Sequence, residues 1–88
     1  MTSMTEITQI QEKVRNFIVQ ERFEGNSPEF FTDDFDLIDS GSIDSLFMVR
    51  LITYLEREFP IEFRMNDFVP KNFKSVNALS ELVKTRMK

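Results

Sequence analysis

Three segments of this 88-residue chain carry apolar residues at the spacing of one face of an α-helix. The middle segment constrains the fold most. It runs from about Asp44 or Ser45 to Phe59, where Pro60 disfavours helical geometry at the residue before it. Its buried stripe is expected to consist of Leu46, Val49, Ile52, Leu55 and Phe59, widened by Leu51. A helix of this length needs packing partners for its apolar face, so the sequence predicts a helical bundle.

The first and last segments are expected to supply those partners. The first begins with a capping box of Ser3 and Glu6 and loses its helical pattern near Glu21. Its apolar face consists of Ile7, Ile10, Val14, Phe17 and Ile18. The last segment begins at Ser75, a favourable N-cap residue. Its apolar face consists of Val76, Leu79, Leu82, Val83 and Met87.

The segment from about Arg22 to Asp44 is expected to be a long loop, of a length that is often functional in compact domains. Its apolar residues should hold it against the core while its aspartates face solvent. These are Phe30, Phe31, Phe35, Leu37 and Ile38, and Asp33, Asp34, Asp36, Asp39 and Asp44. With one short helical turn expected at residues 66–69, the predicted fold class is all-α. Residues 1–88 should form a single domain, a small four-helix bundle with three long helices and one short one.

The composition argues against several classes of function. The chain has no cysteine and no histidine, which excludes disulfides, thiolate metal sites and the Ser-His-Asp or Cys-His type of catalysis. The net charge of −4 comes without a basic patch for nucleic acid, and no run approaches the roughly 20 apolar residues of a membrane helix. We therefore expect a cytoplasmic monomer with no catalytic residue, no metal, no nucleic-acid partner and no membrane insertion.

Ser45 lies where the acidic loop meets the middle helix. A phosphate joined to its hydroxyl would meet the unpaired N–H groups of the first helical turn and the positive end of the helix dipole. The position therefore suits a serine that carries a phosphate or a phosphodiester. The simpler interpretation is that Ser45 only caps the helix, since serine is a favoured N-cap.

The residues around Ser45 resemble those of acyl and peptidyl carrier proteins. Asp44-Ser45-Leu46 looks like the Asp-Ser-Leu signature of that family, and Asp36-Leu37-Ile38-Asp39-Ser40-Gly41 resembles the loop before it. The helix that follows is similar to the family's recognition helix, and Phe59-Pro60-Ile61 and Phe73-Lys74-Ser75-Val76 resemble its closing pattern. The resemblance covers roughly residues 7–83, which is nearly the whole chain.

The resemblance implies a function for Ser45 and Asp44. Ser45 would receive 4′-phosphopantetheine from coenzyme A through a phosphopantetheinyl transferase, and Asp44 would contact a basic residue of that enzyme. The protein would hold acyl or aminoacyl groups as thioesters, loaded by an acyl- or aminoacyl-activating ligase and used by downstream biosynthetic enzymes. Because the reactive thiol belongs to the cofactor, such a carrier needs neither histidine nor cysteine.

The helix after Ser45 departs from the fatty-acid type of carrier, which usually has acidic residues on the exposed face. Here Leu46, Phe47, Met48 and Arg50 are expected to contact partner enzymes. The glycine pair that often precedes the serine in carriers built into large synthetases is also missing. A free-standing carrier of a specialised biosynthetic pathway therefore fits best.

There are three alternatives to this function, and the sequence argues directly against the third. The protein could be a general acyl carrier of fatty-acid synthesis, or a cofactor-free helical module for protein interaction. Calcium binding is a third interpretation of the aspartate-rich loop. In an EF-hand beginning at Asp34, however, Ile38 would occupy the fifth position and Asp39 would replace the required glycine, so the pattern fails.

Overall fold

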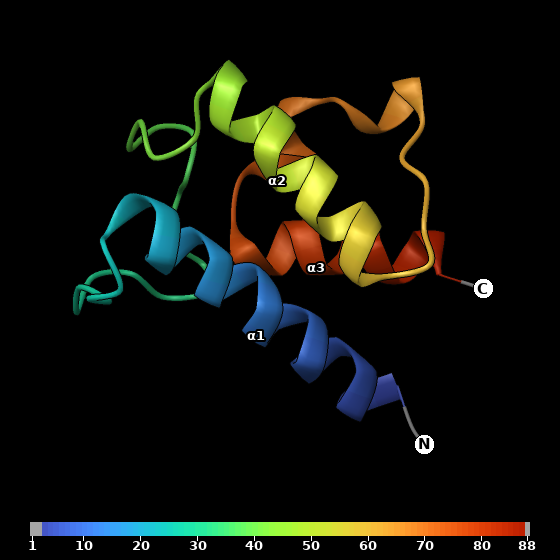
Figure 1. Ribbon diagram of the computed structural model, residues 1–88, viewed down its shortest axis with the longest axis horizontal. Helices are drawn as coiled ribbons and strands as arrows, with labels where there is room; N and C mark the ends of the chain where they lie inside the picture. The colour runs from blue at the N-terminus through green and yellow to red at the C-terminus, as the bar shows by residue number, and fades with distance from the viewer. Residues whose placement is uncertain (1–2, 88) are drawn as a thin grey trace.

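The structure is a computed structural model that describes the backbone of residues 3–87 and the side chains of residues 7–87. It contains three α-helices, α1 (Ser3–Arg22), α2 (Ser45–Glu58) and α3 (Val76–Arg86). Two short 3₁₀ helices, η1 (Met65–Asp67) and η2 (Pro70–Phe73), lie between α2 and α3. In Figure 1, α1 and α2 run along the same diagonal of the view in opposite directions, α3 lies between and behind them, and the long first loop lies at the left. No helix among these residues is long and apolar enough to span a membrane.

The all-α prediction is confirmed, but the fourth helix is not. The expected helical turn at residues 66–69 is replaced by η1 and η2, so the described residues form three α-helices and two 3₁₀ turns. On α1, the predicted face is confirmed, because Ile10, Val14 and Ile18 are fully buried. The capping box expected of Ser3 and Glu6 lies outside the residues whose side chains are described.

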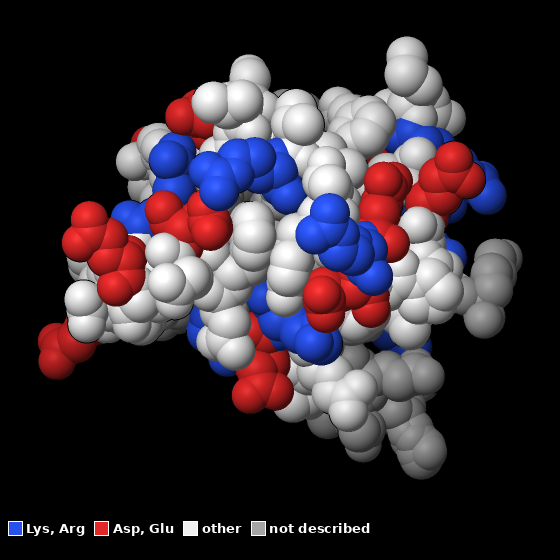
Figure 2. Space-filling model, in the orientation of Figure 1, with Lys and Arg blue, Asp and Glu red and all other residues white. Residues whose placement is uncertain are grey.

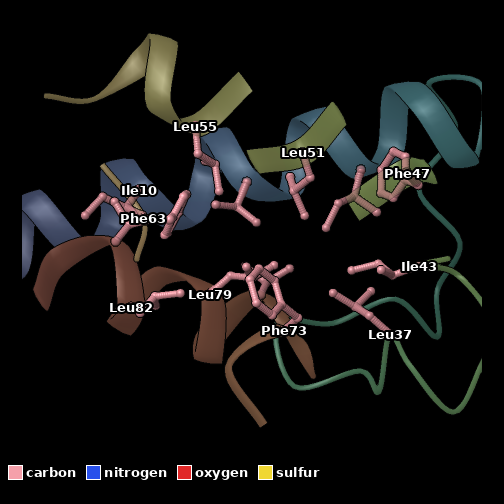
Figure 3. Close-up of a cluster of buried hydrophobic side chains, with 14 of the residues drawn as sticks. Ile10, Leu37, Ile43, Phe47, Leu51, Leu55, Phe63, Phe73, Leu79 and Leu82 are labelled. Carbon is pink, nitrogen blue, oxygen red and sulfur yellow. The ribbon is translucent and has the colours of Figure 1, made fainter. Parts of the chain in front are cut away.

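The buried face of α2 is rotated from the predicted one. Phe47, Leu51 and Leu55 enter the core, as Figure 3 shows. Leu46 and Val49 were expected to be buried, but they are 74% and 60% exposed. The helix carries apolar residues on more than one face. The face that contains Phe47 packs against α1, where the ring of Phe17 stacks on that of Phe47. Leu46 and Val49 are therefore left at the surface.

The first loop is held to the bundle by backbone hydrogen bonds, as well as by apolar side chains. Leu37 N donates to Lys74 O at 2.7 Å, and Asn77 N donates to Asp33 O at 3.0 Å. Phe31 and Leu37 are buried as predicted, but the expectation for Phe30 is wrong because its side chain is 60% exposed. The loop is thereby fixed on α3 close to the start of α2.

Several aspartates of this loop form ion pairs with the helices. Asp33 binds Arg15 of α1 at 2.9 Å, and Asp36 lies 3.9 Å from Lys74. Among the residues with described side chains, no group of three or more acidic side chains is arranged to hold a metal ion. Attachment of the loop to the rest of the protein thus accounts for Asp33 and Asp36.

A buried ion pair fixes η1 to the end of α3. Asp67 is 3% exposed, and its carboxylate accepts two hydrogen bonds from Arg86, at 2.8 Å from Nε and 2.5 Å from Nη2. Asp67 Oδ2 also accepts from Arg64 N at 2.8 Å, and Asn72 Nδ2 donates to Asp67 O at 3.0 Å. These contacts hold the segment that faces the N-terminus of α2.

Candidate functional site

Ser45 is the first residue of α2, and the residue before it caps the helix. Asp44 has an extended backbone, and its Oδ1 accepts a hydrogen bond from Phe47 N at 2.8 Å. Met48 N donates to Asp44 O, which closes the first turn. The interpretation of Ser45 as an N-cap is therefore wrong. Its side chain is exposed, and its hydroxyl makes no hydrogen bond to any residue described.

The end of α1 holds this junction in place through Arg22. Its Nε donates to Ser42 O at 2.7 Å, and its Nη2 donates to Asp44 Oδ2 at 3.2 Å. The guanidinium also lies 4.7 Å from the centre of the Phe47 ring. Hydrogen bonding from Phe47 N and then from Arg22 lowers the pKa of Asp44, so this carboxylate stays ionised beside the serine.

The loop before Ser45 contains two more serines, and both differ from it. Ser40 and Ser42 have their hydroxyls 2.9 Å apart in a hydrogen bond, and Ser40 Oγ also lies 3.3 Å from Leu37 O. Gly41 between them has a φ of 79°, a left-handed conformation that glycine adopts without strain. Only Ser45 of these three presents a hydroxyl without a partner among the described residues.

A groove of about 300 Å³ begins at Ser45 and runs between α2 and the η1–η2 segment. Apolar side chains dominate its walls. The lining residues are Ile38, Ile43, Asp44, Ser45, Met48, Phe68, Val69, Pro70 and Phe73. A chain attached to Ser45 could therefore place an apolar portion against the protein.

The start of α2 also fits a phosphodiester on Ser45. At the first two positions of an α-helix the backbone N–H groups have no partner within the helix, so those of Ser45 and Leu46 remain available. A phosphate on the Ser45 hydroxyl would lie beside these donors and at the positive end of the helix dipole. The groove and the helix terminus together can hold a phosphate-linked arm at its point of attachment.

The four residues predicted to bind partner enzymes differ in how far they are exposed to solvent. Leu46 is exposed next to Ser45, and Arg50 is exposed but forms an ion pair with Glu21 of α1. Met48 is half-buried and lines the Ser45 groove. The expectation of an exposed Phe47 ring is wrong, because Phe47 is 2% exposed and stacks on a ring of α1.

Sequence reasoning missed two exposed apolar residues near the site, Val49 and Phe68. The apolar periodicity predicts a buried Val49, because it lies three residues from Leu46 on the same helix. Phe68 lines the groove from η1–η2, which approaches Ser45 only in the folded bundle. No local pattern in the sequence indicates that Phe68 lies in the groove beside Ser45.

The surface around α1 and α2 carries both signs of charge in close alternation. Figure 2 shows Lys and Arg side chains beside Asp and Glu side chains on this face, without an extended area of one sign. Three of these contacts join α1 to α2 or to its cap: Arg22 with Asp44, Glu21 with Arg50, and Lys13 with Glu58. The face is therefore not a uniformly acidic docking surface.

Comparison with known proteins agrees with this site. A chain in a solved structure titled "Crystal structure of FAD-dependent dehydrogenase" superposes with a TM-score of 0.70 at 25% identity, covering 78% of this chain and 96% of that chain. No curated protein sequence matches significantly. The family model for the phosphopantetheine attachment site matches residues 18–83, which include Ser45 and its groove. Because this match spans most of the chain, the protein belongs to the phosphopantetheine attachment-site family, whose domains carry 4′-phosphopantetheine covalently.

Proposed function

We propose that this protein is a carrier that holds acyl or aminoacyl groups as thioesters on a 4′-phosphopantetheine arm attached to Ser45. The observation that carries the proposal is the exposed Ser45 hydroxyl, which has no partner among the described residues and lies at the start of α2 within the family match. A phosphopantetheinyl transferase would join Ser45 Oγ to the phosphorus of coenzyme A, and the adenine nucleotide part would leave. In this proposal the transferase supplies the general base that accepts the proton of the Ser45 hydroxyl.

Each residue around Ser45 has a positioning task in this function. Asp44 fixes the first turn of α2 and offers a carboxylate to a basic residue of the transferase. Arg22 holds that carboxylate against the bundle. The arm supplies the thiol, while residues 1–88 act as one carrier domain that presents it. Tethering raises the effective concentration of the cargo at each docked enzyme.

We place the protein in a specialised pathway with its own activating ligase, in preference to general fatty-acid synthesis. The support is the mixed charge around α2, where Arg50 replaces the acidic residues of the fatty-acid type. A cation there opposes the basic patches that fatty-acid enzymes present, and such repulsion contributes to specificity.

One class of downstream enzyme can be named more closely. The matched solved structure is titled as a FAD-dependent dehydrogenase, and nearly the whole of the matched chain aligns with this one. We include a flavin-dependent dehydrogenase that acts on the tethered acyl group among the partners. Anaerobic reduction of the flavin by loaded carrier, and not by free acyl-coenzyme A, would support this partner.

The carrier function can be tested with acetyl-coenzyme A as the named donor. A broad-specificity transferase should attach acetyl-phosphopantetheine to the full-length protein, as measured by intact mass. Neutral hydroxylamine should then remove only the acetyl group, because it cleaves thioesters. Ser45→Ala should gain neither group. An unchanged mass for the wild type would instead favour the cofactor-free interaction module.

A further inference from the structure

A second groove, also of about 300 Å³, lies along the contact between α1 and α2. It is separate from the Ser45 groove, because the two share no lining residue. Its lining residues are Phe17, Val49, Arg50, Thr53, Tyr54 and Arg57. We refer to these six residues as the α1–α2 groove.

The floor of the α1–α2 groove is a stacked pair of aromatic rings. The rings of Phe17 and Tyr54 stack with their centroids 4.3 Å apart and their planes at 17°. Val49 adds an aliphatic side chain that is 60% exposed. The Thr53 hydroxyl donates to Val49 O at 2.9 Å, so it is already satisfied. This floor offers a preformed contact for an apolar side chain.

The rim of the α1–α2 groove has an excess of positive charge. Both charged residues that line it are arginines, and Arg50 is paired with Glu21. Arg57 is exposed and makes no hydrogen bond or ion pair with any residue whose side chain is described. A guanidinium without a partner can bind a carboxylate through two parallel hydrogen bonds. The groove therefore complements a negative partner.

We propose that the α1–α2 groove docks a segment of a partner enzyme in which an apolar side chain is flanked by carboxylates. The apolar side chain would pack on Phe17 and Tyr54, and a carboxylate would bind Arg57. Twelve residues of helix separate Arg57 from Ser45, about 18 Å at 1.5 Å per residue. A segment along α2 would thus hold the enzyme beside the arm. This inference rests on the proposed carrier function for the identity of the partner, but the groove's chemistry does not depend on the arm.

Two synthetic amphipathic peptides provide the probe. Both carry the same leucine face, and one has glutamate and the other lysine at the flanking positions. With ¹⁵N-labelled full-length protein, the glutamate peptide should shift the amide signals of Val49, Thr53, Tyr54 and Arg57. Arg57→Glu should weaken that binding about fivefold, while Lys71→Glu, the same charge change at an exposed site elsewhere, should not.

Ser45→Ala separates this inference from the carrier function, because it cannot be loaded and should still bind the glutamate peptide normally. Equal binding of both peptides, or equal effects of Arg57→Glu and Lys71→Glu, would overturn the proposal. Amide shifts in the groove that follow protein concentration without peptide would show that a second copy occupies it, and would also overturn the proposal.

Discussion

Arg22 and Asp44 join the end of α1 to the start of α2. Arg22 Nη2 lies 3.2 Å from Asp44 Oδ2, while Oδ1 of the same carboxylate accepts from Phe47 N at 2.8 Å. One carboxylate therefore caps α2 and forms an interhelical ion pair. Both contacts hold the residue next to Ser45, so the proposed attachment residue is fixed relative to the bundle while its own hydroxyl stays accessible.

The two roles of Asp44 can be separated by two substitutions. Asp44→Asn keeps a good N-cap but removes the charge that pairs with Arg22 in an exposed ion pair, so it should lower the unfolding midpoint only slightly and slow arm attachment. Asp44→Ala removes the cap as well, so it should lower the midpoint and also slow attachment. Thermal unfolding and attachment rates with coenzyme A check both. A normal rate of phosphopantetheine attachment to Asp44→Asn would show that the transferase does not depend on the charge of Asp44.

The rotated face of α2 predicts opposite outcomes for two identical changes. Leu55 is fully buried, so Leu55→Ala should cost about 2–5 kcal/mol through lost contacts and a cavity. Leu46 is 74% exposed, so Leu46→Ala should stay within about 0.5 kcal/mol of the wild type. Urea unfolding of the two variants is the measurement. Similar losses for both would contradict the rotated face.

The α2 helix shows what periodicity alone can decide. Leu46, Val49, Ile52 and Leu55 recur every three residues, and Phe47, Leu51 and Leu55 recur every four. Both spacings are helical, so the pattern correctly predicts a helix in which Leu51 and Leu55 are buried. The choice between the faces depends on Phe17, whose ring lies 5.8 Å from that of Phe47 and belongs to another helix. Local sequence does not contain that contact.

The buried Asp67–Arg86 pair predicts a loss of stability in acid. Hydrogen bonds from Arg86 and then from Arg64 N hold the pKa of Asp67 below its ordinary value of 3.8. Its contribution is therefore complete above that value and is lost as the pH falls through the lower folded pKa. Asp67→Asn should cost roughly 3 kcal/mol near neutral pH, because it leaves Arg86 without its partner charge.

Asp67→Asn also serves as the control for the pH dependence of stability. Between neutral pH and about pH 3, wild-type stability should fall more steeply than that of Asp67→Asn, as measured by urea unfolding. Asp36 and Asp44 also have lowered pKa values, and their contribution remains in the variant. Parallel pH profiles would show that Asp67 is not a source of the acid sensitivity.

Asp67 also explains why the short helical turn expected at residues 66–69 takes the form of 3₁₀ turns. Residues 66–69 have helix-compatible letters, but the buried carboxylate must meet Arg86, which lies 19 residues away. The backbone satisfies that contact by forming η1 and η2, since Asp67 Oδ2 also accepts from Arg64 N. Tertiary contacts of this kind override local propensity.

Partner choice depends in our account on the charge at Arg50. Arg50→Glu should improve use of the loaded protein by fatty-acid synthesis enzymes and weaken its use by the native ligase, because it removes a cation from α2. The substitution also places two carboxylates together, since Arg50 binds Glu21. Loading kinetics of pre-modified protein with each enzyme measure both effects.

A charge-swapped variant is the matched control for Arg50→Glu. Combining it with Glu21→Arg restores an ion pair between the helices but keeps the negative charge on α2. If partners read the charge of α2, the double variant should behave like Arg50→Glu. If it instead behaves like the wild type, the single variant acts through local repulsion and Arg50 does not set partner choice.

At the candidate site, the sequence predicts Ser45 as the attachment residue with Asp44 beside it, but it does not predict their surroundings. The Asp44-Ser45-Leu46 signature is local, so it can be recognised without a structure. The groove beside Ser45 combines residues of the first loop, α2 and η1–η2, which only folding brings together. The two grooves and the role of Arg22 could therefore not be predicted from the sequence.

The attachment of one phosphopantetheine group to Ser45 is the most direct test of this account. Full-length protein is incubated with coenzyme A and a broad-specificity transferase, and the modified residue is located by tandem mass spectrometry. We predict one added group, on Ser45 only, with Ser40 and Ser42 unmodified and Ser45→Ala folded but unlabelled. Ser45→Ala should unfold within about 0.5 kcal/mol of the wild type, because Asp44 caps the helix. Unchanged mass of the wild type, or continued labelling of Ser45→Ala, would contradict the account.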